Sequence, residues 1–192
     1  RQEVAASKKE KGKLNVVFLS RIARMKNLDG ALKMMKPLQG IVNFSIYGPQ
    51  EDNGYWEECR RIIKQLPSNI KVNYYGNVQH ENVVNTISNY DLFFLPTLGE
   101  GYGHVINEAL VAGCPVLISD RTPWRDLENK GIGWDIPLED HERFTSILQR
   151  CIDMTKEEHS KLSIQARGFG EEHARNSESI KQNIELIMDC LK

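Results

Sequence analysis

The chain alternates between short apolar runs and stretches in which apolar residues recur at helical spacing. The apolar runs lack a regular polar alternation, and five of them are predicted as buried strands, at residues 14–19, 41–47, 70–75, 91–95 and 115–119. A weaker sixth strand is predicted at residues 133–136. Strands of this kind, separated by helices, are typical of a parallel sheet that is covered by helices on both faces.

The helices are predicted from apolar residues three and four positions apart and from the Gly and Pro residues that end several of these stretches. They are expected at 27–35, 55–66, 80–88, 103–112, 124–129, 139–154, 156–173 and 177–191. The sequence therefore predicts a doubly wound, Rossmann-like α/β domain with about six parallel strands. Ligands of such sheets bind beyond the carboxyl ends of the strands, so the loops there are the candidate functional segments.

Charge and composition narrow the possible partners. The 192 residues include 25 Lys and Arg against 26 Asp and Glu, so no basic excess favours nucleic acid and no acidic excess favours disorder. The longest apolar stretch, residues 109–118, is broken by Gly113 and Pro115 and is too short to cross a membrane. No signal peptide opens the chain, and the cysteine spacing favours reduced thiols. We expect a cytoplasmic protein, either free or peripheral to the membrane.

The chain divides into three predicted parts. Residues 1–12 are polar and Lys-rich and are expected to form a linker or flexible arm, followed by the domain at 13–175. Residues 176–192 are predicted as a C-terminal helix that packs toward a missing N-terminal domain. The chain begins with Arg1 rather than Met, which favours a piece of a longer protein. The apolar stripe of the last helix consists of Ile180, Ile184, Ile187, Met188 and Leu191.

The loop after the first predicted strand carries three cations, Arg21, Arg24 and Lys26. Guanidinium and ammonium groups at this edge of the sheet could hold a phosphate or a diphosphate. A solvated basic turn is an equally good interpretation of these residue types alone.

The loop after the fourth predicted strand is rich in glycine and leads into a helix. Glycines at 99, 101 and 103 allow a ligand to approach the backbone closely, and the helix N-terminus is a ready anion site. Glu100 and Glu108 could accept hydrogen bonds from two sets of hydroxyls. Alternatively, Glu100 is an acidic helix-start residue and Glu108 a solvated helix position. The turn is weak evidence by itself, because it lacks a Walker Lys-Ser/Thr.

Metal chemistry is not predicted. His104 and Glu108 are four residues apart and could form part of a metal pair, but the sequence offers no third ligand. No Asp-x-Asp motif is present to hold a metal on a diphosphate.

Two motifs together resemble those of a known family. The stretch EGYGHVINEALVAGCPVLISD contains Glu100 and Glu108 with seven residues between them, and SRIARMKN places Arg21 and Lys26 after the first strand. Over residues 13–175 the chain resembles the C-terminal half of the retaining glycosyltransferases of family 4, also called glycosyl transferases group 1. It departs from the family pattern in having Ser20 and Asn27 where glycines are usual. The resemblance implies one half of a two-domain GT-B fold.

The resemblance also implies roles for single residues toward a nucleoside-diphosphate sugar. Arg21 and Lys26 would neutralise the diphosphate, Glu108 would accept the ribose hydroxyls, and Glu100 would be the catalytic-site residue that contacts the donor sugar. Gly48 would leave room for the donor. The backbone contacts to the sugar and phosphates would come from Gly101, Tyr102, Gly103, His104 and Val105. The loop along the nucleobase would consist of Gly76, Asn77 and Val78.

The implied function is the donor-binding domain of a hexosyltransferase in polysaccharide or glycolipid assembly. It would transfer sugar to a carbohydrate or lipid-linked acceptor, without a metal, and with no cofactor besides the donor substrate. The acceptor domain would precede this chain, which would then be incomplete for catalysis. The alternatives are a sugar-nucleotide epimerase, a phosphorylase-like GT-B relative and a non-catalytic nucleotide-sugar-binding module. Retention of both acids and both cations argues against the last of these.

Overall fold

The computed structural model describes residues 9–190, with side chains described through residue 177. Its six strands are β1 (Lys13–Leu19), β2 (Ile41–Tyr47), β3 (Ile70–Tyr74), β4 (Leu92–Leu95), β5 (Val116–Ser119) and β6 (Gly133–Ile136). They form one sheet in the order β3-β2-β1-β4-β5-β6, and all pairs are parallel. The predicted doubly wound α/β fold is confirmed.

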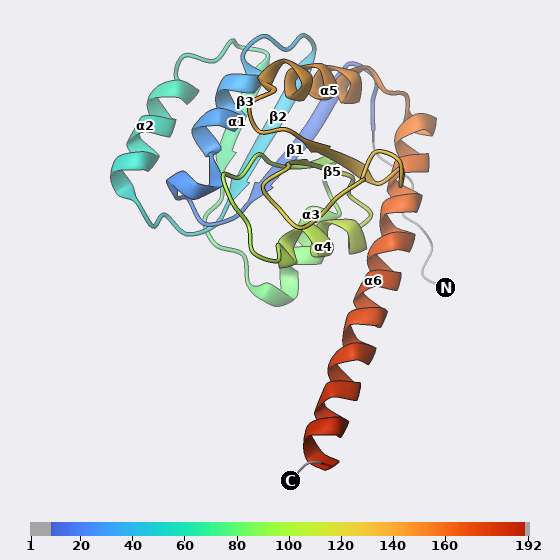
Figure 1. The fold of residues 1–192 in the computed structure, drawn as a ribbon. Helices are drawn as coiled ribbons and strands as arrows, with labels where there is room; N and C mark the ends of the chain where they lie inside the picture. The colour runs from blue at the N-terminus through green and yellow to red at the C-terminus, as the bar shows by residue number, and fades with distance from the viewer. Residues whose placement is uncertain (1–8, 191–192) are drawn as a thin grey trace.

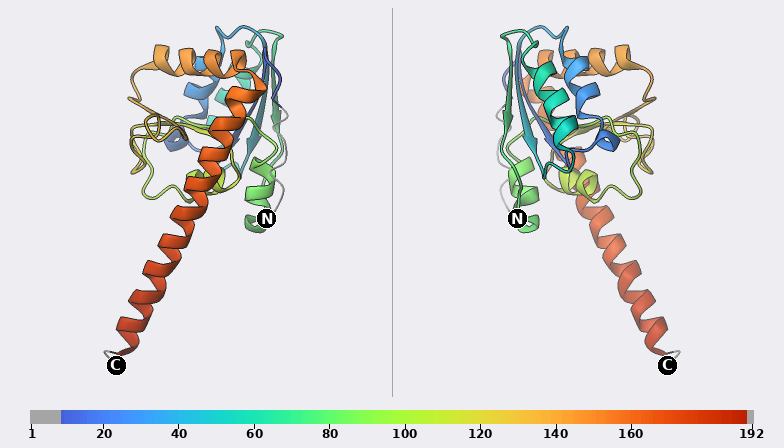
Figure 2. Two further views of the ribbon diagram at one scale, coloured as in Figure 1. Left: turned by 90° about the vertical axis from the view of Figure 1, so that its right-hand side faces the viewer. Right: turned by 90° about the vertical axis from the view of Figure 1, so that its left-hand side faces the viewer.

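Helices cover both faces of the sheet (Figures 1 and 2). They are η1 (Arg24–Lys26), α1 (Leu28–Met35), α2 (Asn53–Ile63), η2 (His80–Asn82), α3 (Val83–Ile87), α4 (His104–Val111), α5 (His141–Asp153) and α6 (Lys156–Cys190). Helices α1, α2 and α5 pack together on one face, and α3, α4 and α6 pack together on the other. The chain winds outward from β1 in both directions, and right-handed crossovers then place the two sets of helices on opposite faces.

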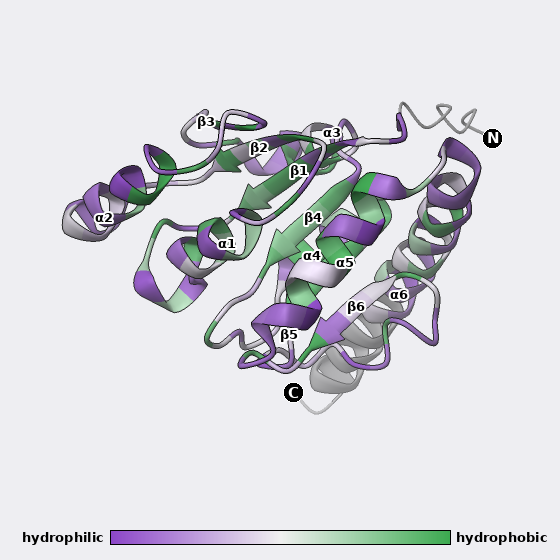
Figure 3. Ribbon diagram, turned by 90° about the horizontal axis from the view of Figure 1, so that it is seen from above, coloured by the Kyte–Doolittle hydropathy of each residue, from purple (hydrophilic) through white to green (hydrophobic). Residues whose placement is uncertain are grey.

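The core lies along the central strands, which are green in the hydropathy view of Figure 3. Every residue of β4 and of β5 is buried. Two helix layers remove both sides of these strands from water, which explains why their sequences are continuous apolar runs. The order of the sheet reverses between β1 and β4, so the loops that follow these two strands lie next to each other at the carboxyl edge.

The prediction of a helix at 124–129 is wrong, because the structure has an irregular segment followed by a turn there. Asp126 adopts a left-handed backbone conformation with φ 62°, which a helix cannot contain. The Asp135 carboxylate, from β6, accepts hydrogen bonds from the backbone N–H groups of Asp126 and Leu127 at 3.1 and 2.9 Å. The Asp135 side chain therefore holds these two backbone N–H groups in a turn whose conformation at Asp126 is not helical.

The two helices predicted at 156–173 and 177–191 are a single helix, α6. Residues 174–176 are Ala, Arg and Asn, and with neither Gly nor Pro among them nothing stops the helix. In Figure 1, α6 passes along the sheet and projects beyond its carboxyl edge. The domain boundary predicted at residue 175 falls inside α6. The apolar stripe predicted for the last helix begins at Ile180 and so lies beyond the side chains that the structure describes.

Residues 9–12, the end of the predicted arm, lie against the domain, while residues 1–8 are outside the described part. Lys9 is buried and its ammonium donates to the carbonyls of Lys13 and Ile152 at 2.7 and 3.0 Å. The backbone N–H of Gly12 also donates to the Ile152 carbonyl, at 2.8 Å.

Within the described residues, no helix has both the length and the apolar character needed to cross a bilayer.

Candidate functional site

The loop after β1 is fixed by an unusual residue at its end. Asn27 adopts the left-handed conformation, with φ 55° and ψ 43°. Asn and Gly are the residues that tolerate this conformation best, which explains how Asn27 can occupy a position where the family motif has glycine. Its side-chain amide donates to the Pro96 carbonyl at 2.8 Å and so connects this loop to the one after β4. The amide packs where a side chain at Gly30 would otherwise lie.

Lys26 and Glu100 form an ion pair between these two loops. The Lys26 ammonium lies 2.6 Å from Oε2 of Glu100, and their side chains are only 7% and 19% exposed. Because the pair is largely removed from water, each charge interacts more strongly with its neighbours than it would at the surface. The structure thus brings together two residues that the sequence placed 74 positions apart.

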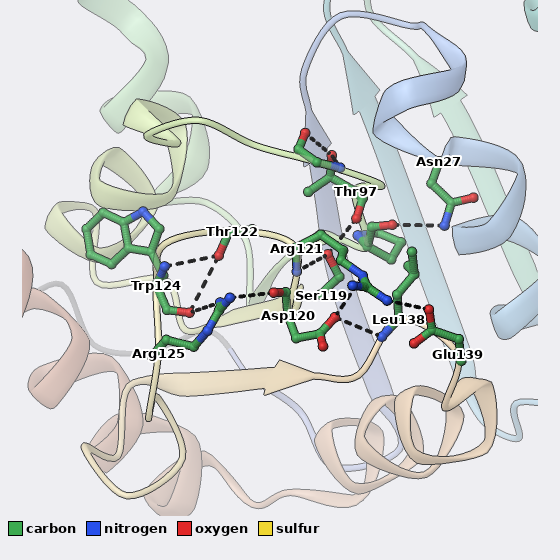
Figure 4. Close-up of polar contacts among 12 residues, drawn as sticks. Asn27, Thr97, Ser119, Asp120, Arg121, Thr122, Trp124, Arg125, Leu138 and Glu139 are labelled. Carbon is green, nitrogen blue, oxygen red and sulfur yellow. Dashed lines mark hydrogen bonds and ion pairs between the residues drawn. The ribbon is translucent and has the colours of Figure 1, made fainter.

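The hydroxyl and the backbone carbonyl of Thr97 connect the loops after β1 and β4 with the end of β5. The Thr97 Oγ1 lies 2.9 Å from the Met25 carbonyl and 2.8 Å from the Gly99 carbonyl. The Ser119 hydroxyl, at the end of β5, donates to the Thr97 carbonyl at 2.5 Å, as Figure 4 shows. The sequence analysis missed Thr97 and Ser119. The only signal for them is a polar residue at or just after the end of a fully buried strand.

Arg21 lies at the same edge but forms a different contact. Its guanidinium Nη1 donates to both carboxylate oxygens of Glu51, at 3.0 and 3.1 Å, and the two side chains are 58% and 41% exposed. Arg24, the third cation of the loop, pairs with Glu58 of α2 at 2.6 Å. The cations of this loop are therefore divided among three different acids, of which only Glu100 was anticipated.

The glycine-rich loop presents the N-terminus of α4. Gly103, with φ 76°, precedes the helix and supplies no side-chain cap, so the helix begins with N–H groups at His104 and Val105 that no capping side chain satisfies. A side chain at Gly103 would press against Ile106, while one at Gly101 would meet open space. Open amides and the positive end of the helix dipole make this an anion-binding position.

Glu108 lies in the second turn of α4 and is 20% exposed. Burial raises the pKa of its carboxyl above the usual value, and attraction to His80 and His104 opposes that shift. The His80 Nδ1 lies 3.3 Å from Glu108 Oε1, while most of the His80 side chain faces solvent. His80 belongs to η2 and was not predicted as a site residue.

Gly48 holds the ends of β1, β2 and β3 together. Its φ is 129°, and a Cβ there would overlap the carbonyl oxygen of Ser20. Its N–H donates to the Gly76 carbonyl at 2.8 Å, which anchors the loop carrying Asn77 and Val78. The backbone of the loop after β1 thus fills the space beside Gly48. The fold therefore requires glycine at this position whether or not a donor is bound.

Among the residues that the structure describes, no three His, Cys, Asp or Glu side chains come close enough together to hold a metal ion.

The fold and this site define a Rossmann-like α/β domain of the GT-B type, with its polar residues gathered where the strand order reverses. The family called glycosyl transferases group 1 matches residues 1–169. The chain therefore belongs to this family.

Similar proteins agree with this assignment. The chain is 25% identical, over 136 residues, to the GtfA subunit of a UDP-N-acetylglucosamine–peptide N-acetylglucosaminyltransferase from Streptococcus agalactiae, covering 68% of this chain and 26% of the relative. A glycosyltransferase from Rickettsia africae superposes with a TM-score of 0.81 at 15% identity, covering 95% of this chain and 49% of the other. Anabaena HepE, solved with UDP and glucose, superposes with a TM-score of 0.75 at 16% identity, and the match covers 91% of this chain and 48% of HepE. The chain thus spans about a quarter of the curated relative and about half of the two solved proteins.

Proposed function

We propose that this chain is the donor-binding domain of a retaining, family 4 glycosyltransferase that uses a nucleoside-diphosphate sugar. The single observation that carries the proposal is the Lys26–Glu100 pair, which lies beside the uncapped N-terminus of α4 at the reversal point of the sheet. The pair offers a cation for phosphate and a carboxylate for sugar hydroxyls within one small region. An N-terminal acceptor domain would supply the other wall of the cleft.

The diphosphate is the part of the donor for which the site is best suited. As the glycosidic bond breaks, the leaving diphosphate gains negative charge, and fixed positive groups stabilise that charge. Lys26 supplies a poorly hydrated ammonium, and the first N–H groups of α4 supply the positive end of a helix dipole. Arg21 reaches the same edge and can exchange Glu51 for a phosphate oxygen. These protein groups provide the neutralisation without a metal, as the proposal requires.

Glu100 is suited to hold the donor sugar. Its backbone N–H donates to the Arg121 carbonyl at 2.9 Å, and one carboxylate oxygen is bonded to Lys26. A carboxylate that is fixed at both ends can accept sugar hydroxyls with little loss of side-chain entropy. The sugar would then lie next to its own leaving group.

The finer parts of the proposal follow from the family resemblance. They are retention of configuration, transfer of a hexose, a carbohydrate or lipid-linked acceptor, and a role in polysaccharide or glycolipid assembly at the cytoplasmic side of the membrane. They are tested on the full-length protein by analysing the product and its anomeric configuration. Titration of this chain with UDP, GDP and ADP tests the donor site itself. Binding by none of the three would contradict the proposal.

Arg21 gives the first specific prediction. Arg21→Ala should weaken UDP binding about tenfold, because a charged hydrogen bond to phosphate contributes about 1.5–3 kcal/mol and the exposed position of Arg21 favours the lower end of this range. Stability should change by less than about 1 kcal/mol, because the Arg21–Glu51 pair is exposed. Calorimetric titration and thermal melting measure the two effects. The matched control is Arg24→Ala, in the same loop but paired toward α2. Equal losses of affinity in both variants would contradict the assignment.

Glu108 gives a prediction of opposite effects on binding and on stability. Glu108→Gln should weaken UDP binding about tenfold, because a neutral amide replaces a charged acceptor of the ribose hydroxyls. The same variant should melt at or above the temperature of the parent near pH 7.5, because the buried charge opposes folding.

The pH dependence supplies the check on Glu108. An acid whose pKa is raised on folding binds its proton more tightly in the folded state, so the parent protein gains stability as the pH falls toward that pKa. The difference in melting temperature between Glu108→Gln and the parent should therefore shrink as the pH falls toward 5. A variant that is less stable at neutral pH would show that Glu108 has a structural role instead.

A further inference from the structure

A row of five aromatic rings leads from the glycine-rich loop to α6. The ring of His104 lies 4.4 Å from that of Tyr102, and Tyr102 lies 6.4 Å from Trp124 in an edge-to-face arrangement. Trp124 lies 4.8 Å from His173, and His173 lies 6.1 Å from Phe169 in a stacked arrangement. We call these five residues the aromatic row. It begins at the glycine-rich loop of the candidate donor site and ends at Phe169 of α6.

The far end of the aromatic row opens into a small pocket of about 230 Å³. Its walls include four of the rings, those of Tyr102, Trp124, Phe169 and His173, together with Lys130. This volume lies below the range that drug-sized ligands occupy and suits a single small ring. Apolar walls with a few polar groups are the usual composition of a ligand pocket.

Three polar groups belong to residues that line the pocket, namely the Lys130 ammonium, the Trp124 indole N–H and the His173 imidazole. The Lys130 ammonium lies 5.6 Å above the Phe169 ring and donates to the Arg125 carbonyl at 2.8 Å. The indole N–H of Trp124 donates to the Tyr102 carbonyl at 2.7 Å, which fixes the Trp124 ring. Among the described residues, the buried Nδ1 of His173 has no hydrogen-bond partner. Buried polar atoms are seldom left unpaired, so this nitrogen is a position where a water or a ligand atom would supply the missing partner.

The chemistry of the row selects the kind of ligand. Aromatic ring faces are negative, and they attract the polarised C–H groups on the face of a pyranose. An ammonium group beside the rings can donate to sugar hydroxyls. Trp124 is only 7% exposed, whereas Tyr102 is 43% exposed, so a ligand made of successive rings would contact the row at Tyr102 and at the wall of the pocket.

We propose that the aromatic row binds the saccharide acceptor, with one of its pyranose rings in the pocket bounded by Trp124, Lys130 and Phe169. The inference rests on the proposed function, because the row starts at the loop that would hold the donor. It adds an acceptor-binding surface on the donor domain itself. Bases of a single-stranded nucleic acid also stack on rings, but the net charge of −1 provides no basic groove for a phosphate backbone.

The test uses the three tryptophan indole N–H resonances of the nitrogen-15-labelled chain, assigned with Trp124→Phe. The probes are maltotriose, cellotriose, triacetylchitotriose, their monosaccharides, a short oligothymidylate and, separately, UDP. We expect at least one trisaccharide to shift the Trp124 resonance and to bind more tightly than its monosaccharide. Phe169→Leu with Lys130→Ala should weaken that binding about tenfold, while UDP affinity stays within about twofold.

Three results would overturn the inference. They are no shift of the Trp124 resonance with any trisaccharide, equal saccharide affinity in the parent and the double variant, and tighter binding of the oligothymidylate than of every saccharide. Melting curves of Phe169→Leu and Lys130→Ala singly confirm that the domain remains folded. Failure of UDP, GDP and ADP all to bind would count against the proposed function, whereas binding of one of these nucleotides without saccharide binding would reject the acceptor surface alone.

Discussion

Lys26→Ala is expected to impair both stability and donor binding. Removing the ammonium leaves Glu100 mostly buried without its counterion, which destabilises the fold by about 3 kcal/mol, the lower end for a broken buried pair because Glu100 is 19% exposed. The melting temperature should fall by about 6–12 °C. UDP affinity should fall by about 10- to 150-fold, because the diphosphate loses its least exposed cation.

A double variant separates these two effects. Lys26→Met with Glu100→Gln removes both charges and keeps the side chains similar in size, so most of the lost stability should return. UDP affinity should remain low, because no ammonium is restored. Thermal melting and calorimetric titration of the parent, Lys26→Ala and the double variant measure the effects on stability and on UDP binding separately. Recovery of UDP binding in the double variant would show that Lys26 serves the fold and not the diphosphate.

Gly48→Ala is expected to produce the other large effect. The new methyl group would overlap the Ser20 carbonyl, and the φ of 129° is one that only glycine adopts readily. The loop after β1 must then move or the strand end must distort. We expect a loss of about 3 kcal/mol or more, with UDP affinity falling because Arg21 and Lys26 are displaced. Chemical unfolding measured beside a UDP titration tests both expectations.

Two other glycines of the site serve as graded controls. Gly76→Ala keeps a positive φ of 75° but meets no neighbouring atom, so it should cost about 1–2 kcal/mol. Gly101→Ala has neither a positive φ nor a close neighbour and should change stability by less than about 0.5 kcal/mol. A loss at Gly48 no larger than that at Gly76 would mean that the contact with Ser20 is readily relieved.

The fold was predictable because burial leaves a clear pattern. The central strands are covered on both sides, so their sequences are continuous apolar runs, and the strand ends identify the loops of the site. The prediction of a helix at 124–129 failed because Asp126 adopts a left-handed conformation, and the backbone there is held by the carboxylate of Asp135, a residue of a later strand. No local window of sequence contains that partner.

The site was predictable to a similar extent. The motif places Lys26 and Glu100 at the same edge of the sheet, and the structure pairs them directly. The partners Glu51 and His80 were missed because each comes from a loop or short helix with no motif of its own. Spacing along a chain predicts which loop a residue occupies, but not which acid or base it meets across the gap between loops.

The hydrogen bonds of Thr97 have a consequence for how this candidate site can diversify. The loops after β1 and β4 and the end of β5 are connected through the hydroxyl and the backbone carbonyl of Thr97, so a change in any one of them disturbs the other two. The segment after β3 is joined to this assembly by the Gly48–Gly76 hydrogen bond. If the proposed function holds, substitutions in residues 77–82 should alter base preference while the loops that carry Lys26 and Glu100 stay intact, which makes this short segment the place to graft a new nucleotide selectivity.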